Sequence, residues 1–249
     1  MKIAKLLLAM AIVALLPAIT WAAAAGSGIA GTSHDFSAKG GGIGLCTFCH
    51  TPHRAIQSQL LWNHTLSTNT FSWDVASTTA GTNYPSFKGD TYMGPTAKCL
   101  SCHDGSVAVG DIAWWSEGKP ASLDNTKHEW PDAFNVGATG GVAGSMKGNH
   151  PVAMPFPFNN ASNTYNGITT GTQITLSEWR TDPQTYGIRL YNDPGTGFIT
   201  AGAVASKTGI ECSSCHEPHN GAAAKDDLFL RGKMAGTSTD YICEKCHAK

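Results

Sequence analysis

The segment "CTFCHTPH", residues Cys46–His53, carries the pattern on which the organisation of this chain depends. Two cysteines are separated by two residues, a histidine directly follows the second cysteine, and another histidine comes three residues later. The whole pattern returns as "CSSCHEPH" at Cys212–His219, and its first five positions return at Cys99–His103 and Cys243–His247. All 8 cysteines lie in these motifs, which we number one to four along the chain.

The motifs predict covalent haem attachment. In a C-x-x-C-H segment the two thiols bond to the vinyl groups of a haem, and the histidine becomes the proximal ligand of the iron. A structural zinc site has no need of a histidine after each cysteine pair. A thioredoxin-like redox pair would occur once, beside a βαβ pattern. We therefore expect four haem c groups, attached through Cys46, Cys49, Cys99, Cys102, Cys212, Cys215, Cys243 and Cys246, with His50, His103, His216 and His247 as proximal ligands.

The start of the chain predicts a signal peptide over residues 1–25. A basic start and the apolar run Ile3–Ala18, interrupted only by Lys5, lead into the small-residue segment "WAAAA" at Trp21–Ala25. The run is short for a membrane span of about 20 residues. We expect a secreted protein without a membrane span, located outside the cell or at its surface, with the periplasm as the alternative. The motif spacing overrides the disulfides that export would otherwise favour.

Composition and spacing predict one coil-rich domain over residues 26–249. Only 14% of the residues are charged, against a typical ~25%, so a nucleic-acid partner is not expected. Haem pairs are expected at about 34–110 and 206–249, around a middle of about 111–205 that is rich in Gly, Ser, Thr and Asn. No amphipathic helix of ordinary length stands out. We expect a coil-rich multihaem cytochrome with short helices and a few short strands, whose core is organised by the four haems.

Histidines outside the motifs supply candidates for the distal ligands. The candidates are His34, His53, His64, His128, His150 and His219, while Met93, Met146, Met154 and Met234 are competing ligands. His53 cannot reach the distal side of the haem held by His50, because three residues span at most about 10 Å. Pro52 also turns the chain away after the proximal ligand. We therefore expect His53 to serve a different haem, and His219, behind Pro218, repeats the pattern.

These motifs, together with "SHDFS" (Ser33–Ser37) and "NHPV" (Asn149–Val152), resemble those of the doubled C-x-x-C-H multihaem cytochromes. The mature chain is similar to the OmcE-type tetrahaem cytochromes, the subunits of extracellular nanowires of metal-reducing bacteria. The short motifs cover nearly the full length, but the middle segment matches only at "NHPV". The resemblance implies bis-histidine haems in a continuous stack, with one distal ligand borrowed from a neighbouring subunit. It points to His34, His53, His150 and His219 as distal ligands. His64 stands where relatives carry arginine and His128 has no motif around it, so both are spare.

The expected function is electron conduction rather than catalysis. No cluster of Asp, Glu, Arg and Tyr surrounds any motif, as a multihaem reductase with one open haem would need. The expected partners are other copies of the chain in a filament, redox partner cytochromes and extracellular metal oxides, and respiratory electrons would pass to these external acceptors. A monomeric periplasmic tetrahaem shuttle is the alternative, and the reductase is a further one.

The position of His53 suggests how a filament could form. Only Ala248 and Lys249 follow the fourth motif, so no downstream chain remains to cover the last haem. One hypothesis is that His53 of the next subunit ligates that haem, in a head-to-tail contact that need not close. Alternatively, His53 reaches the second haem of its own chain.

Overall fold

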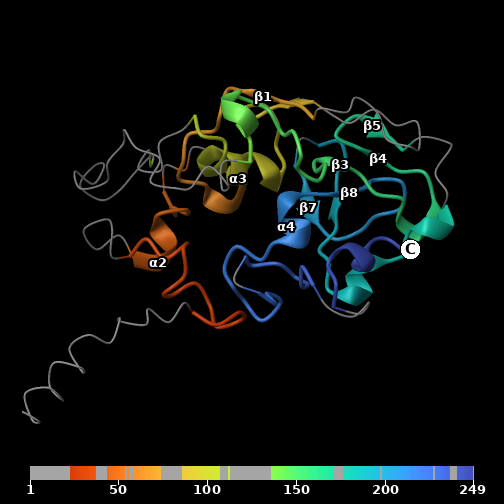
Figure 1. Cartoon of the computed structure of the whole chain (residues 1–249). Coiled ribbons are helices and arrows are strands. Elements are labelled where there is room, and N and C mark those ends of the chain that lie inside the picture. The colour runs from red at the N-terminus through yellow and green to blue at the C-terminus, as the bar shows by residue number, and fades with distance from the viewer. Residues whose placement is uncertain are drawn as a thin grey trace, which may run out of the picture.

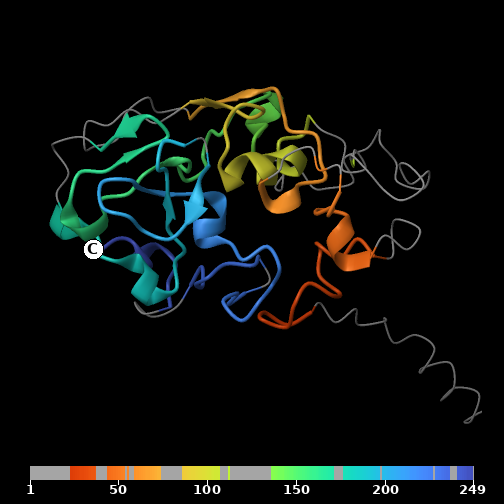
Figure 2. The same cartoon turned by 180° about the vertical axis from the view of Figure 1, so that it is seen from behind.

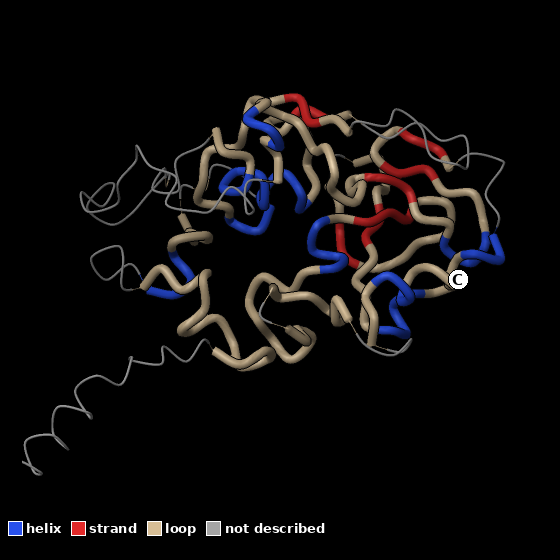
Figure 3. The backbone as a smooth tube through the Cα atoms, in the orientation of Figure 1, coloured by secondary structure: helices blue, strands red, loops and turns tan. Residues whose placement is uncertain are grey.

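The computed structural model describes part of the chain, and its regular elements are short. The described residues are 23–37, 44–53, 55, 59–73, 86–106, 112, 136–170, 176–196, 198–226, 228–235 and 240–248. Residues 1–22 of the expected signal peptide and His128 lie outside them. Loops and turns connect the short helices and strands throughout the described chain (Figure 3).

Among the described residues, the helical elements contain the whole of the second motif and part of each of the other three. The α-helices are α2 (Gly44–Thr47), α3 (Pro95–His103) and α4 (Cys212–Cys215). The 3-10 turns are η1 (Gln59–Leu61), η3 (Thr139–Gly141), η4 (Phe158–Asn160), η5 (Leu176–Glu178), η6 (Pro183–Tyr186) and η7 (Cys243–Lys245). Helix α3 has Pro95 in its first turn, where a backbone N–H has no helical partner to lose.

The strands form one four-stranded sheet and two small hairpins. The strands are β1 (Thr70–Phe71), β2 (Phe87–Lys88), β3 (Met154–Pro155), β4 (Thr164–Tyr165), β5 (Ile168–Thr169), β6 (Tyr191–Asn192), β7 (Thr200–Ala201) and β8 (Thr208–Ile210). The larger sheet has the antiparallel order β3-β8-β6-β7, while β1 pairs with β2 and β4 with β5. In β8, Gly209 lies opposite Pro155 and Tyr191, and the Tyr165 ring packs against it.

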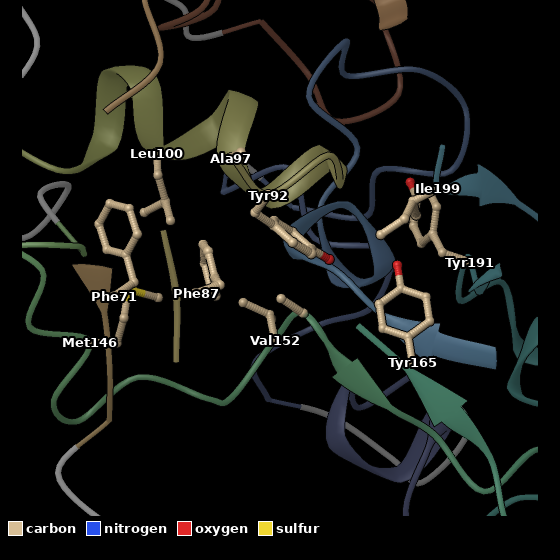
Figure 4. Close-up of a cluster of buried hydrophobic side chains, with 11 residues drawn as sticks. Phe71, Phe87, Tyr92, Ala97, Leu100, Met146, Val152, Tyr165, Tyr191 and Ile199 are labelled. Atoms are coloured by element: carbon tan, nitrogen blue, oxygen red, sulfur yellow. The ribbon is translucent and has the colours of Figure 1, made fainter. Parts of the chain in front are cut away.

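Two clusters of buried side chains lie next to the motifs. The first contains Phe71, Phe87, Tyr92, Ala97, Leu100, Met146, Val152, Ala153, Tyr165, Tyr191 and Ile199 (Figure 4). The second contains Phe156, Ile188, Leu190, Ile210, Leu230 and Ile242. Cys212 packs against the first cluster, and Cys215 and Cys246 pack against the second. Apolar packing therefore fixes the third and fourth motifs, while haem as the organiser of the core stays a prediction.

The N-terminal segment packs on the chain that follows the third motif. Gly26 N–H donates to Asn220 Oδ1 at 3.0 Å, and Asn220 Nδ2 donates to the carbonyls of Ala24 and Gly28. Figures 1 and 2 show this segment, in red, beside the blue C-terminal part of the chain. Residues 24–28 thus contact Asn220, and His34 is brought close to the third motif, where its Nδ1 lies 2.9 Å from Pro218 O.

Candidate functional site

Each motif forms one helical turn. The histidine N–H donates to the carbonyl of the first cysteine: His50 to Cys46 at 2.9 Å, His216 to Cys212 at 3.0 Å, and His247 to Cys243 at 2.9 Å. The second motif forms the last part of α3. A turn of 3.6 residues brings the two cysteines and the histidine onto neighbouring parts of one surface. The local backbone is therefore alike in all four motifs.

Cysteines of successive motifs lie close together, so the motifs follow one another in space. Burial and the nearby Cys49 raise the pKa of the Cys102 thiol to about 12. The thiols of Cys99 and Cys212 are hydrogen-bonded to each other, which raises the pKa of Cys99. Burial, followed by Cys215, raises the pKa of Cys246 to about 12. The first motif thus neighbours the second, the second neighbours the third, and the third neighbours the fourth.

Three proximal histidines face three of the expected distal histidines. The ring centroids of His50 and His219 lie 6.1 Å apart, those of His103 and His34 lie 6.1 Å apart, and those of His247 and His150 lie 6.4 Å apart. Each pair joins a motif histidine to a histidine from a distant part of the sequence. The structure therefore brings together three of the four pairs that a bis-histidine tetrahaem protein requires.

The separation of these rings fits a shared iron. Two imidazole nitrogens at about 2.0 Å from one metal place their ring centroids roughly 6 Å apart. Ring pairs that pack directly in this chain have centroid separations from 4.1 Å for Phe36 and Phe48 to 6.2 Å for Trp73 and Phe87, so the spacing is compatible with a shared iron without requiring one. A haem takes two axial protein ligands, and neutral imidazole is a common one. The residues present thus fit the group that the motifs predict.

Backbone carbonyls hold the Nδ1 atoms of four of these histidines. The pairs are His34 with Pro218 O at 2.9 Å, His50 with Leu60 O at 2.6 Å, His150 with Pro151 O at 2.8 Å, and His216 with Leu228 O at 2.9 Å. Because a carbonyl only accepts, Nδ1 must carry the proton and Nε2 keeps its lone pair. Burial also lowers the pKa of His34, which favours neutral imidazole. Such contacts fix the tautomer and the orientation of metal-binding histidines.

The fixation of His219 depends on a buried ion pair. The Glu217 carboxylate contacts His219 Nδ1 at 3.3 Å and Arg231 Nη2 at 2.5 Å. Burial raises the pKa of Glu217, but Arg231 and then Arg189 outweigh this effect and hold it below its usual value. Glu217 therefore stays ionised and orients His219. Sequence reasoning missed Glu217, although its place between two histidines was a signal.

Three short backbone segments, which we call straps, flank the first, third and fourth motifs. They are residues 60–63, 228–231 and 178–180. Each strap accepts a hydrogen bond from the residue after the proximal histidine and donates one to the second cysteine. The accepting bonds are Thr51 N–H to Leu61 O at 2.8 Å, Glu217 N–H to Phe229 O at 2.6 Å, and Ala248 N–H to Glu178 O at 2.8 Å. The donating bonds are Asn63 N–H to Cys49 O at 2.9 Å, Arg231 N–H to Cys215 O at 2.7 Å, and Arg180 N–H to Cys246 O at 2.8 Å.

The straps were not predicted from the sequence. Two of them share a pattern, "LLWN" at 60–63 and "LFLR" at 228–231, each with a left-handed second residue. The strap of the fourth motif precedes that motif in the sequence. The centroid of its Trp179 ring lies 4.5 Å from the centroid of the His247 ring. Only the similarity of the first two strap sequences could have revealed them.

The remaining histidines lie apart from these pairs. Among the described residues, no histidine ring faces His216, and His53 is exposed. His64 is buried beside Phe48 and Trp62, with ring centroids 4.9 and 5.7 Å away. The His150 ring lies 6.4 Å from the His247 ring, so a histidine of the same chain is near the fourth motif, and the hypothesis that His53 of another chain ligates the haem there stays a prediction. His150 comes from upstream in the sequence, which the reasoning about downstream chain did not consider.

Comparisons with known proteins give no family assignment. No family model matches the chain, and no curated protein matches it. Within the described ranges, no group of three or more His, Cys, Asp or Glu side chains is arranged to hold a metal ion. A bis-histidine haem needs only two axial protein ligands. Across the same ranges, no helix has the length and apolar character needed to cross a membrane.

Proposed function

We propose that this protein is a secreted tetrahaem c-type cytochrome that conducts electrons as the subunit of an extracellular filament. The four motifs would attach the haems through their cysteines and ligate the irons through His50, His103, His216 and His247. The haems would supply one-electron chemistry when bound. Respiratory electrons would pass to redox partner cytochromes or to extracellular metal oxides.

The observation that carries the proposal is the set of three histidine pairs. Each motif histidine of a pair faces one histidine chosen as a distal ligand from the resemblance, at centroid separations of 6.1 to 6.4 Å. These separations match those of two imidazoles on one iron, and the Trp73 and Phe87 rings, which pack directly, lie at a similar 6.2 Å, so the support comes from which residues are paired rather than from the spacing alone. Carbonyl contacts at Nδ1 would keep Nε2 available for iron.

The contacts between motifs support conduction along the chain. Cysteines of the first and second, second and third, and third and fourth motifs lie near one another. Haems attached to adjacent cysteines would be adjacent as well. Four haems in sequence order would give electrons a continuous route, without a substrate reaching the iron.

The third motif is the place where a neighbouring chain would contribute. His216 has no facing histidine among the described residues, while His53 is exposed. His219, which follows the third motif, faces His50 of the first motif in the same chain. His53 follows the first motif in the same way. By analogy, His53 of one chain would face His216 in the third motif of its neighbour. The borrowed ligand is therefore proposed for His216 rather than for the fourth motif. His216 is also the observation that favours the alternative of a reductase with one open haem.

Haem load and spin state test the proposal. The mature protein should exceed its polypeptide mass by four haems, and the Cys99→Ala, Cys102→Ala double variant should carry three. Assembled protein should be fully low-spin and bind carbon monoxide poorly. A wild-type load below four haems would refute the attachment scheme.

The His53→Gly variant separates the two interpretations of His216. The borrowed-ligand scheme predicts that filaments are lost and that each released chain has one five-coordinate haem. Wild-type protein that stays monomeric with one high-spin haem and reduces small nitrogen compounds would support the reductase instead. Filaments that persist in His53→Gly with all haems low-spin would refute the borrowed ligand.

A further inference from the structure

A buried carboxylate lies between the second and third motifs, and haem attachment does not account for it. Glu211 directly precedes Cys212 and is fully buried. Its side chain accepts a hydrogen bond from the backbone N–H of Ser214, and the Ser214 hydroxyl accepts one from Glu211 N–H at 2.9 Å. This reciprocal capping box begins α4. A buried carboxylate is costly unless donors surround it, so its further contacts matter.

The same carboxylate also holds the beginning of α3. Thr96 N–H donates to Glu211 Oε2 at 2.9 Å, and Cys212 N–H donates to the Thr96 hydroxyl at 3.1 Å. Glu211, at the start of α4, thus accepts a hydrogen bond from a backbone N–H in the first turn of α3. Thr96, in the first turn of α3, accepts one from a backbone N–H in the first turn of α4. Because Cys99 lies one turn further along α3, this arrangement sets it beside Cys212.

Two buried tyrosines complete the shell around Glu211. The hydroxyls of Tyr92 and Tyr165 both donate to Glu211 Oε1, Tyr165 at 2.6 Å. Figure 4 shows their rings entering from opposite sides, with the hydroxyl groups turned toward each other. Burial, and then the charge of Glu211, raise the pKa of both tyrosines. Both phenols therefore remain protonated and act as donors.

The contacts of Glu211 favour its ionised form. Burial raises the pKa of Glu211 above its usual value, and the hydrogen bonds from Thr96, Tyr165 and Tyr92 oppose that rise without cancelling it. Every polar group that touches the carboxylate is a donor, and the first turns of α3 and α4 add favourable dipoles. Lys98 lies within electrostatic range of Glu211. Burial lowers the pKa of Lys98 to about 8, and the nearby Glu211 carboxylate opposes that shift. We assign a negative charge to this site.

We propose that Glu211 is a positioning residue that joins the second and third motifs and keeps a negative charge between the haems attached to them. The inference rests on the proposed function, because it concerns haems at these two motifs. A nearby negative charge favours the oxidised iron, and low-dielectric surroundings strengthen that effect. Glu211 therefore lowers the reduction potentials of the two middle haems.

Spectroelectrochemical titration of the full-length, haem-loaded protein tests this inference. In Glu211→Gln, two of the four one-electron steps should move to more positive potentials. We expect at least a tenfold change in each reduction equilibrium, which corresponds to about 59 mV for one electron. Glu211→Asp keeps the charge and should titrate close to wild type. The control is Glu244→Gln, which removes a half-buried carboxylate within the fourth motif and should cause a smaller shift because water screens it.

The possible results separate this inference from the proposed function. A titration curve of Glu211→Gln that overlies wild type, with four low-spin haems bound, would overturn the inference and leave the function intact. Equal shifts in Glu211→Gln and Glu211→Asp would also overturn it, since geometry rather than charge would be responsible. If Glu211→Gln fails to load, Tyr165→Phe replaces it. Removing that hydroxyl takes away a donor that favours the ionised carboxylate, so the same two steps should move to more positive potentials, and an unchanged curve refutes the inference.

Discussion

Replacing His150 with alanine should convert one haem per chain to a five-coordinate state. His150 is the partner of His247, at a centroid separation of 6.4 Å. The side chain is exposed, and its hydrogen bond from Nδ1 to Pro151 O, at 2.8 Å, is a local one. Loss of such a contact at the surface costs about 1 kcal/mol or less. The fold should therefore survive, and the fourth haem alone should lose its distal ligand.

Carbon monoxide titration and electron paramagnetic resonance provide the assay. His150→Ala should bind one more carbon monoxide per chain than wild type under identical assembly conditions, and it should gain one high-spin ferric signal. His53→Ala is the matched control, because in dispersed protein it should add no open haem. If His150→Ala keeps the wild-type spin state and carbon monoxide stoichiometry, the assignment of His150 to the fourth haem is wrong. The three-pair arrangement would then lose one of its supports.

Three substitutions test the packing and the charges around the motifs. Gly209→Ala would place a Cβ 2.3 Å from Tyr165 Cγ, and this overpacking should destabilise the protein by about 2 kcal/mol in denaturant unfolding. Arg231→Met should cost about 3–5 kcal/mol, because it leaves Glu217 buried without its closest cation. Lys98→Met should remove a rise in the stability of the wild type between about pH 8 and 10. Burial lowers the pKa of Lys98 to about 8 in the folded protein, so in this range the unfolded chain binds more protons than the folded chain and stability increases with pH.

The ion pair has a second consequence in acid. The pKa of Glu217 is lowered in the folded protein, so its stabilisation is fully present above the unfolded value of 4.5 and is lost as the pH falls through the folded value. Arg231→Met should weaken this acid dependence. A parallel pH profile in wild type and variant would contradict the assignment. For the packing test, Gly221→Ala is the control, because its Cβ would meet Glu217 Cγ at an ordinary 3.8 Å. Equal stability of the two alanine variants would contradict the overpacking argument.

The second motif shows why some features of the site are accessible from sequence. Attachment and proximal ligation involve five consecutive residues, and the geometry of one helical turn is enough to bring them together. The turn at Pro52 is similarly local, and it indicated that His53 points away from its own haem. Residue spacing carries this kind of information because the chain between the groups is too short to vary.

Which histidines face one another depends on tertiary structure rather than on local spacing. His150 reaches His247 because β3, which begins at Met154, pairs with β8 and carries the preceding loop toward the fourth motif. The hypothesis that a neighbouring chain ligates the fourth haem considered only the chain that follows the motif, and it stays a prediction. Glu217 and the straps were missed for the same reason, since their partners are set by folding rather than by spacing.

The sequence is sufficient to predict where haems would attach, because covalent attachment would depend on a short segment with one available geometry. It could not assign His219 to His50 or His34 to His103, since many pairings satisfy the same spacing and composition. Long-range packing selects among them: Asn220 and Pro218 hold the N-terminal segment against the third motif, and that contact brings His34 to its place. Apolar burial and hydrogen bonds between distant segments, which no local pattern encodes, determine which histidines face each other.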